Sequence, residues 1–171
     1  MPDTTTISET RVLELEPQPT LAARIQQPMA ALDLASAFDR YLPLVFERAR
    51  ELGGRIAGAP FGRYHAFGPD HVDVEIGIPI AAPIAGVATL GSLPAGEIGA
   101  SELPGGPVAR TVHRGSYDGL SGAYDALHAW IHEQPGIDDA AGPWESYVDN
   151  PVEVSDASKL RTEITWPVRR T

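Results

Sequence analysis

A single carboxylate distinguishes two similar segments of this chain. Residues 60–64 read PFGRY and residues 143–147 read PWESY, so Gly62 stands where the second segment carries Glu145. A carboxylate in an apolar cleft loses hydration, which raises its pKa or requires a cation or hydrogen-bond donor beside it. Glu145 could therefore bind a cationic group or act as a general acid or base. The alternative is a surface glutamate on an edge strand.

Three tyrosines are candidates for a binding site with Glu145. Tyr147 shares its strand face because side chains alternate along a strand, and Tyr64 holds the equivalent place in the first segment. Aromatic walls with polar tips suit flat or cationic ligands, although both tyrosines could equally belong to the core. Tyr117 lies at the start of an expected helix, where it could face a ligand or close the helix entry.

The remaining polar candidates have structural explanations as well. Glu163 repeats Glu75 of the first half and shares a strand face with Arg161, so it could form an ion pair or serve as a secondary pocket residue. His128 and His132 are four residues apart on an expected helix, but a zinc site needs a third ligand. A solvated helix face explains this pair, so we predict no metal ligands and no cofactor.

A duplicated series of elements must position these residues. Helices are expected over residues 34–52, capped by Asp33, and over residues 117–134, capped by Ser116. Strands are expected at residues 11–15, 20–26, 61–66 and 72–80, and again at 98–103, 108–113, 144–148 and 160–168. Each half reads strand, strand, helix, strand, strand, which predicts an α+β fold of antiparallel sheets with one long helix per half. We predict a flexible tail over residues 1–10 and a single domain over 11–168, built from pseudo-repeats at about 11–81 and 97–168.

The composition excludes several classes of protein. The chain has 171 residues, 43% of them hydrophobic, a formal net charge of −10 and no cysteine. Without cysteine there is no disulfide or thiolate chemistry. Scattered basic residues argue against direct nucleic-acid binding. No apolar run approaches the roughly 20 residues of a membrane span, and the polar start is no secretory signal, so we expect a cytoplasmic protein that does not enter a membrane.

Four motifs, in their order and spacing, resemble the GyrI-like small-molecule-binding family. They are LPGGPVA at residues 103–109, HRGSY at 113–117, WESY at 144–147 and RTEITWPV at 161–168. The same module resembles the effector domains of AraC-type and MerR-type multidrug regulators. The resemblance covers about residues 11–168 and implies duplicated βαββ units (a src-homology-2-like pair) with a ligand cleft between the halves. It also implies that Glu145 faces this cleft, whereas Thr165 stands where relatives often carry an aromatic residue.

The resemblance gives three hypotheses for function. The first is a stand-alone protein that binds hydrophobic, planar or cationic compounds, with Glu145 as the charged anchor. The second, which would make it an enzyme, is hydrolysis of cyclopropane-containing cytotoxins, in which Glu145 activates water and the hydroxyl of Tyr147 stabilises the oxyanion. The third is an acidic protein-interaction or inhibitor module. A homodimer or a protein partner is compatible with each of them.

Overall fold

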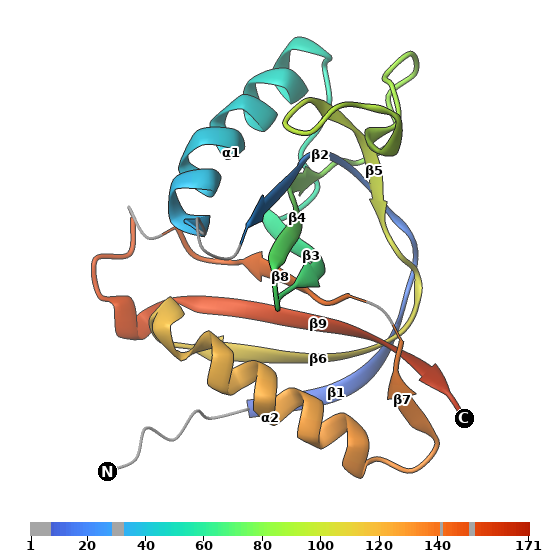
Figure 1. Cartoon of the computed structure of the whole chain (residues 1–171), viewed down its shortest axis with the longest axis vertical. Coiled ribbons are helices and arrows are strands. Elements are labelled where there is room, and N and C mark those ends of the chain that lie inside the picture. Colours follow the sequence, from blue (N-terminus) through green and yellow to red (C-terminus); the bar gives the residue numbers. More distant parts are fainter. Residues whose placement is uncertain (1–7, 29–32, 141, 151–152) are drawn as a thin grey trace. The chain divides into compact units, whose positions relative to one another are not determined.

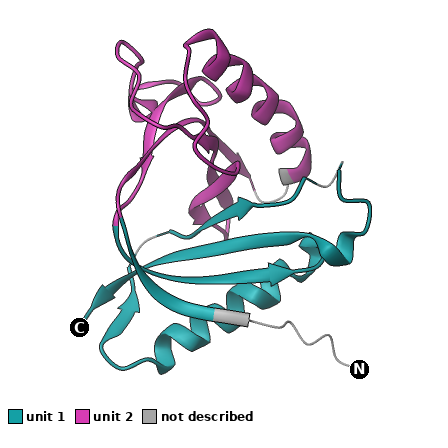
Figure 2. Cartoon of the chain, turned by 180° about the vertical axis from the view of Figure 1, so that it is seen from behind, with its two compact units in different colours: residues 1–15, 106–171 teal, residues 16–105 magenta. Residues whose placement is uncertain are grey.

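The chain folds into two compact units. The computed structural model describes residues 8–28, 33–140, 142–150 and 153–171. Unit 1 joins the segment up to Leu15 to residues 106–171, and unit 2 is formed by residues 16–105 (Figure 2). Across the described residues there are two α-helices and nine strands, and the strands pair antiparallel. This confirms the predicted α+β class.

Unit 2 is a four-stranded sheet covered by one helix (Figure 1). Its elements are β2 (Gln18–Pro28), α1 (Leu34–Glu51), β3 (Phe61–Phe67), β4 (His71–Pro79) and β5 (Ile98–Leu103), with the strands in the order β3-β4-β2-β5. Asp33 caps α1 as predicted, because its carboxylate accepts a hydrogen bond from the backbone nitrogen of Ser36 at 3.0 Å. The helix then buries Val45 and Ala49 against the sheet residues Leu21, Ala23, Ile78 and Ile80.

Unit 1 has the same kind of layer. Its elements are β1 (Ser8–Leu15), β6 (Gly106–Arg114), α2 (Leu120–Glu133), β7 (Ile137–Asp139), β8 (Trp144–Tyr147) and β9 (Arg161–Arg170). The strand order is β1-β6-β9-β8, and β7 pairs with the far end of β9. Helix α2 lies along β6 and β9 (Figure 1) and buries Ala123, Leu127 and Ile131 on Ala109, Ile164 and Val168.

The first strand of each half of the sequence belongs to the unit formed by the other half. β1 precedes β2 in the chain but pairs with β6, and β5 precedes β6 but pairs with β2. Pro17 and Pro19 lack the N–H groups that a tight hairpin between β1 and β2 would use. Each unit is therefore a β-α-β-β series with one added edge strand from elsewhere in the sequence.

Two local predictions differ from the structure. β1 begins at Ser8, so residues 8–10 belong to a strand rather than to the expected tail, and residues 1–7 lie outside the described residues. Ser116 was wrongly predicted to cap the second helix: its side chain makes no capping hydrogen bond. A short 3-10 turn (Tyr117–Gly119) comes first, because the carbonyl of Ser116 accepts from the backbone nitrogen of Gly119 at 3.2 Å. Neither described helix combines the length and apolar character that crossing a membrane requires.

Candidate functional site

Glu145 is a buried carboxylate on the helix side of the sheet of unit 1. It lies opposite Ile164 of β9 and is 5% exposed. Residues paired across two strands share a face, and Ile164 packs beneath α2, so the side chain of Glu145 points toward the helix layer. Trp144 is also buried and faces the other way, opposite Thr165. The interpretation of Glu145 as a surface residue therefore does not hold.

The strand register supports the alignment of residues 60–64 with residues 143–147. In unit 2 Gly62 lies opposite Ile76 of β4, as Glu145 lies opposite Ile164 of β9 in unit 1. The two positions are thus equivalent within their own sheets. A glycine occupies this place in one unit and a carboxylate occupies it in the other.

Two of the predicted tyrosines lie beside Glu145. The hydroxyl of Tyr147 donates a hydrogen bond to Oε2 of Glu145 at 2.7 Å. The ring of Tyr117 meets the ring of Tyr147 edge to face, with centroids 5.8 Å apart and planes at 65°. Glu145, Tyr147 and Tyr117 therefore form one cluster within unit 1, with Tyr117 on its exposed side.

The surroundings of the cluster shift the pKa values of two of its members, Glu145 and Tyr117. Burial raises the pKa of Glu145, and the hydroxyls of Tyr147 and Tyr124 together with the nearby His113 only partly oppose this effect. Burial also raises the pKa of Tyr117, with further contributions from the negative charges of Glu145 and Asp149. A carboxyl with a raised pKa can exchange a proton close to neutral pH more readily than an ordinary glutamate.

His113 and Thr162 lie on the same face as Tyr147 and were not predicted as site residues. Across the sheet His113 pairs with Thr162, which pairs with Tyr147, and both new residues are buried. Nε2 of His113 lies 2.9 Å from the carbonyl oxygen of Ser116, so this nitrogen donates. Within the described part of the chain, Nδ1 of His113 and Oγ1 of Thr162 have no hydrogen-bond partner. The alternation of β6, which turns Ala109 and His113 to one face, was the signal available in the sequence.

Two other carboxylates are equally buried, and each forms an ion pair with an arginine: Asp73 with Arg24 at 2.6 Å and Glu75 with Arg63 at 3.7 Å. Asp73 is 6% exposed and receives two hydrogen bonds from the guanidinium of Arg24, at 2.8 and 2.6 Å, which lower its pKa. Glu75 is 3% exposed. Burial acts to raise its pKa, but hydrogen bonds with His65 and from Ser101 (2.6 Å) outweigh this and lower it.

Glu145 differs from these two carboxylates in the sign of its pKa shift and in its partners. The residues that act on its pKa include two tyrosines and a histidine but no arginine or lysine of the described chain. A buried negative charge without a cation beside it is costly, because the carboxylate has lost its hydration and no opposite charge compensates for that loss. A positive group next to this carboxylate would favour its ionised form.

The other two predicted site residues lie elsewhere. Tyr64 belongs to unit 2, where it packs on the buried core of Ile25, Val72, Val74 and Ile76 and meets Phe67 edge to face at 5.8 Å. Glu163 lies opposite Ser146, on the face of β9 that is turned away from Glu145.

The ion pair suggested for Glu163 forms with a different arginine. Its Oε1 lies 3.4 Å from Nε of Arg110 on the neighbouring strand. The expected partner, Arg161, instead pairs with Asp149 at 2.9 Å. Arg110 lies opposite Thr165 and Glu163 lies opposite Val112, so the two are diagonal neighbours on adjacent strands. Long side chains reach across such a diagonal.

The raised pKa of Glu145 predicts how the stability of the free protein depends on pH. The native chain keeps a proton on Glu145 to higher pH than the unfolded chain does, so the free energy of unfolding decreases as pH rises through this window. Glu145→Gln removes that loss. We expect the melting temperature of the variant to exceed that of the wild type at pH 8, and by a smaller margin at pH 5. For a chain of this size, each kcal/mol of unfolding free energy corresponds to about 2–4 °C. Thermal unfolding at both pH values measures the difference, and an equal change at both would contradict burial as the cause.

In sequence and fold the chain is similar to known proteins. Residues 9–169 match the model of the GyrI-like small molecule binding domain. No curated protein sequence matches the chain.

Among solved structures, the C-terminal domain of EcmrR is 22% identical, with a TM-score of 0.77 over 95% of this chain and 98% of that domain. In the EcmrR–DNA complex the match covers 99% of this chain but 60% of the EcmrR chain, so the present chain spans about three fifths of that protein. SAV2435 bound to tetraphenylphosphonium is 15% identical, with a TM-score of 0.65 over 94% of each chain. A hydrolase encoded by lin2189 from Listeria innocua is 11% identical, with a TM-score of 0.60 over 94% of this chain and 91% of that one. At these identities the likeness concerns the fold.

Proposed function

Because the chain belongs to the GyrI-like small molecule binding domain family, we propose that it binds a lipophilic cation whose positive group is held by Glu145. The observation that carries this proposal is the buried carboxylate with a raised pKa, beside which the described chain places no arginine or lysine. A ligand cation would supply the missing charge, and the attraction is strong where water is excluded. Asp73, which is paired with Arg24, has no such need.

The aromatic residues beside Glu145 suit the apolar part of such a ligand. The rings of Tyr147 and Tyr117 lie next to the carboxylate and offer both area and the negative potential of their faces. The hydroxyl of Tyr147 holds the carboxylate in place through its hydrogen bond. The net charge of −10 attracts cations from a distance and repels anions. Together these features favour flat or bulky hydrophobic cations over neutral or anionic compounds.

Calorimetric titration of the full chain with tetraphenylphosphonium tests this function, since that cation is bound to SAV2435 in a related fold. We expect saturable binding of one cation per chain, roughly 10–100-fold tighter than binding of the neutral, similarly shaped triphenylphosphine oxide. The affinity should rise between pH 5 and pH 8, because only the ionised carboxylate attracts the cation. A cation that binds no better than the neutral compound, with no dependence on pH, would rule out a carboxylate anchor.

Hydrolysis of a strained electrophile is the second candidate function, and the raised pKa of Glu145 is the observation that favours it. In its ionised form this carboxylate can accept a proton from water as the water oxygen bonds to a ring carbon, while the electron pair of the broken carbon–carbon bond forms the oxyanion. Tyr147 would then have to turn its hydroxyl from Glu145 toward the developing oxyanion. Incubation of the chain with an excess of a cyclopropane-bearing cytotoxin, followed by mass spectrometry, separates the two functions. Product that forms with the wild type and not with Glu145→Ala supports hydrolysis, whereas unchanged compound leaves binding as the function.

A further inference from the structure

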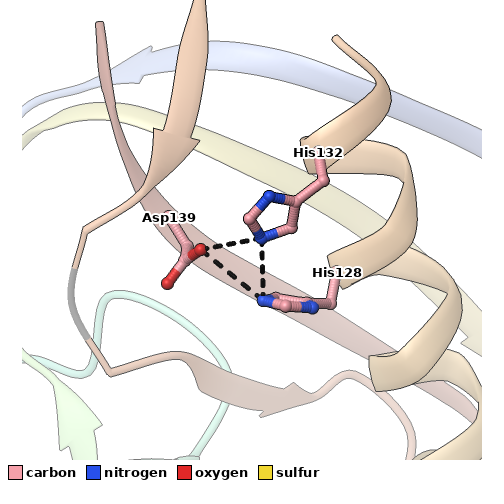
Figure 3. A group of neighbouring side chains, drawn as sticks. All are labelled: His128, His132 and Asp139. Carbon is pink, nitrogen blue, oxygen red and sulfur yellow. Dashed lines mark hydrogen bonds and ion pairs between the residues drawn. The ribbon is translucent and has the colours of Figure 1, made fainter. Parts of the chain in front are cut away.

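A second group of polar side chains lies between α2 and β7, within unit 1. Figure 3 shows the two imidazole rings of His128 and His132 turned toward the carboxylate of Asp139. Nε2 of His132 lies 3.0 Å from Nε2 of His128 and 3.0 Å from Oδ1 of Asp139. Nε2 of His128 lies 3.5 Å from the same carboxylate oxygen. Three atoms that can each bind a metal ion thus form a compact triangle.

Local structure brings these three side chains together. His128 and His132 are one helical turn apart and so share a face of α2. Asp139 is the last residue of β7, which is fixed by pairing with β9, where Asp139 lies opposite Val168. The ring of His128 also packs on Trp166, with centroids 5.1 Å apart. The sequence alone shows no third ligand for the two histidines, whereas the fold places the carboxylate of Asp139 beside them.

We propose that the cluster of His128, His132 and Asp139 is a binding site for a divalent transition metal ion, with Zn²⁺ the best-suited ion. Tetrahedral zinc has bonds of about 2.0–2.1 Å to nitrogen and oxygen, which places neighbouring ligand atoms roughly 3.3–3.4 Å apart. The observed separations of 3.0, 3.0 and 3.5 Å bracket that value. A single point can therefore lie at bonding distance from all three atoms with little movement of the side chains.

The chemistry of the donor set selects the class of ion. Two imidazoles and one carboxylate suit zinc, copper, nickel or cobalt, whereas magnesium and calcium prefer oxygen ligands alone. All three side chains are partly exposed, so an ion can enter from solvent. Three protein ligands leave a fourth tetrahedral position on the solvent side for water or another small ligand.

A second carboxylate lies behind His132. Oδ1 of Asp138 is 3.7 Å from Nδ1 of His132, the ring nitrogen that the metal would not use. Asp138 accepts hydrogen bonds from Arg169 at 3.2 Å and from the backbone nitrogen of Asp139 at 2.9 Å. A carboxylate in this place orients a metal-binding imidazole and increases its basicity. Asp138 would therefore act as a positioning residue for the site.

Titration of the full chain, free of any histidine tag, with Zn²⁺ tests the proposal. We expect one ion per chain by calorimetry at pH 7.5, and at least about tenfold weaker binding in His132→Ala and in Asp139→Asn. Asp138→Asn should keep the stoichiometry with a smaller loss of affinity. His71→Ala is the matched control, because His71 is an exposed histidine in unit 2 and its loss should leave the affinity unchanged.

Substitution by Co²⁺ adds a readout that depends on geometry. The visible spectrum of the wild type should be that of a tetrahedral ion and should disappear in His132→Ala. If the two imidazoles only share a proton with Asp139 and bind no metal, the tetrahedral Co²⁺ spectrum should not appear in the wild type. Absence of saturable zinc binding in the wild type, or equal affinity in the wild type and in His128→Ala and His132→Ala, would overturn the proposal. The substituted side chains are exposed or half-buried, so circular dichroism should show that each variant remains folded.

Discussion

Replacement of Glu145 by glutamine is expected to weaken the binding of tetraphenylphosphonium by roughly 10–100-fold. Glutamine has nearly the same size, so the packing around β8 is kept while the negative charge is lost. A hydrogen-bonded or ionic contact to a charged group is worth about 1.5–3 kcal/mol, and each 1.4 kcal/mol is about tenfold in affinity. The effect lies at the upper end of this range if the cation sits directly against the carboxylate. Glu145 is 5% exposed, so dissolved salt screens its attraction to the cation only weakly.

A matched control is available on the neighbouring strand. Glu163 lies on the opposite face of the sheet and is paired with Arg110, so Glu163→Gln should change the affinity by less than about twofold. The comparison also separates the two glutamates that the sequence puts forward as ligand-binding residues. Equal affinity of Glu145→Gln and the wild type, or an equal loss in both variants, would show that the anchor has been assigned to the wrong residue.

Gly77→Ala is expected to cost unit 2 about 3 kcal/mol or more of its stability. Gly77 lies in β4 opposite Ala22 of β2. A methyl group there would stand 2.4 Å from the carbonyl oxygen of Leu21 and 2.6 Å from Cβ of Ala22. These atoms belong to the backbone and to the shortest side chain, so neither can swing aside and the two strands would have to separate. Overpacking in a well-packed interior costs about 1–3 kcal/mol even where side chains can adjust.

Urea unfolding of the variant measures this cost as a lower transition midpoint. Gly91→Ala is the appropriate control, because Gly91 lies in the short 3-10 helix Leu90–Ser92 and no described atom beyond its chain neighbours lies within 4 Å of the added carbon. Its effect should stay within about 0.5 kcal/mol. Similar midpoints for the two variants would mean that β2 and β4 tolerate a wider separation than their packing suggests.

The elements of the fold were largely predictable, but the strand partners were not. The helical period and the cap at Asp33 placed α1 within one residue of its observed end, Glu51, and alternation located the long strands. The alternation of apolar and polar residues predicts which face of the sheet a side chain takes, but it does not predict which strand pairs with its own. Because the two halves of the sequence have similar patterns, the pairing of β1 with β6 and of β5 with β2 was not available from either half.

The same limits explain what was found and missed at the candidate sites. The mismatch between Gly62 and Glu145 selected the position that the register makes equivalent in the two units. His113 was missed because a buried polar residue looks like a surface residue until its strand is placed in a sheet. Asp139 was missed because β7 has three residues, too few to show a period.

The exchange of first strands also determines when each unit can be completed as the ribosome makes the chain. All strands of unit 2 exist once residue 105 has been added, whereas β1 emerges first and must wait for β6. The hydrogen bond from the hydroxyl of Thr10 to that of Thr111 spans 101 residues of sequence. Such long loops are slow to close and leave an early strand edge unpaired in the meantime. A chain divided between β4 and β5 would give two pieces that each lack one edge strand of their sheet, so neither piece could complete its sheet alone.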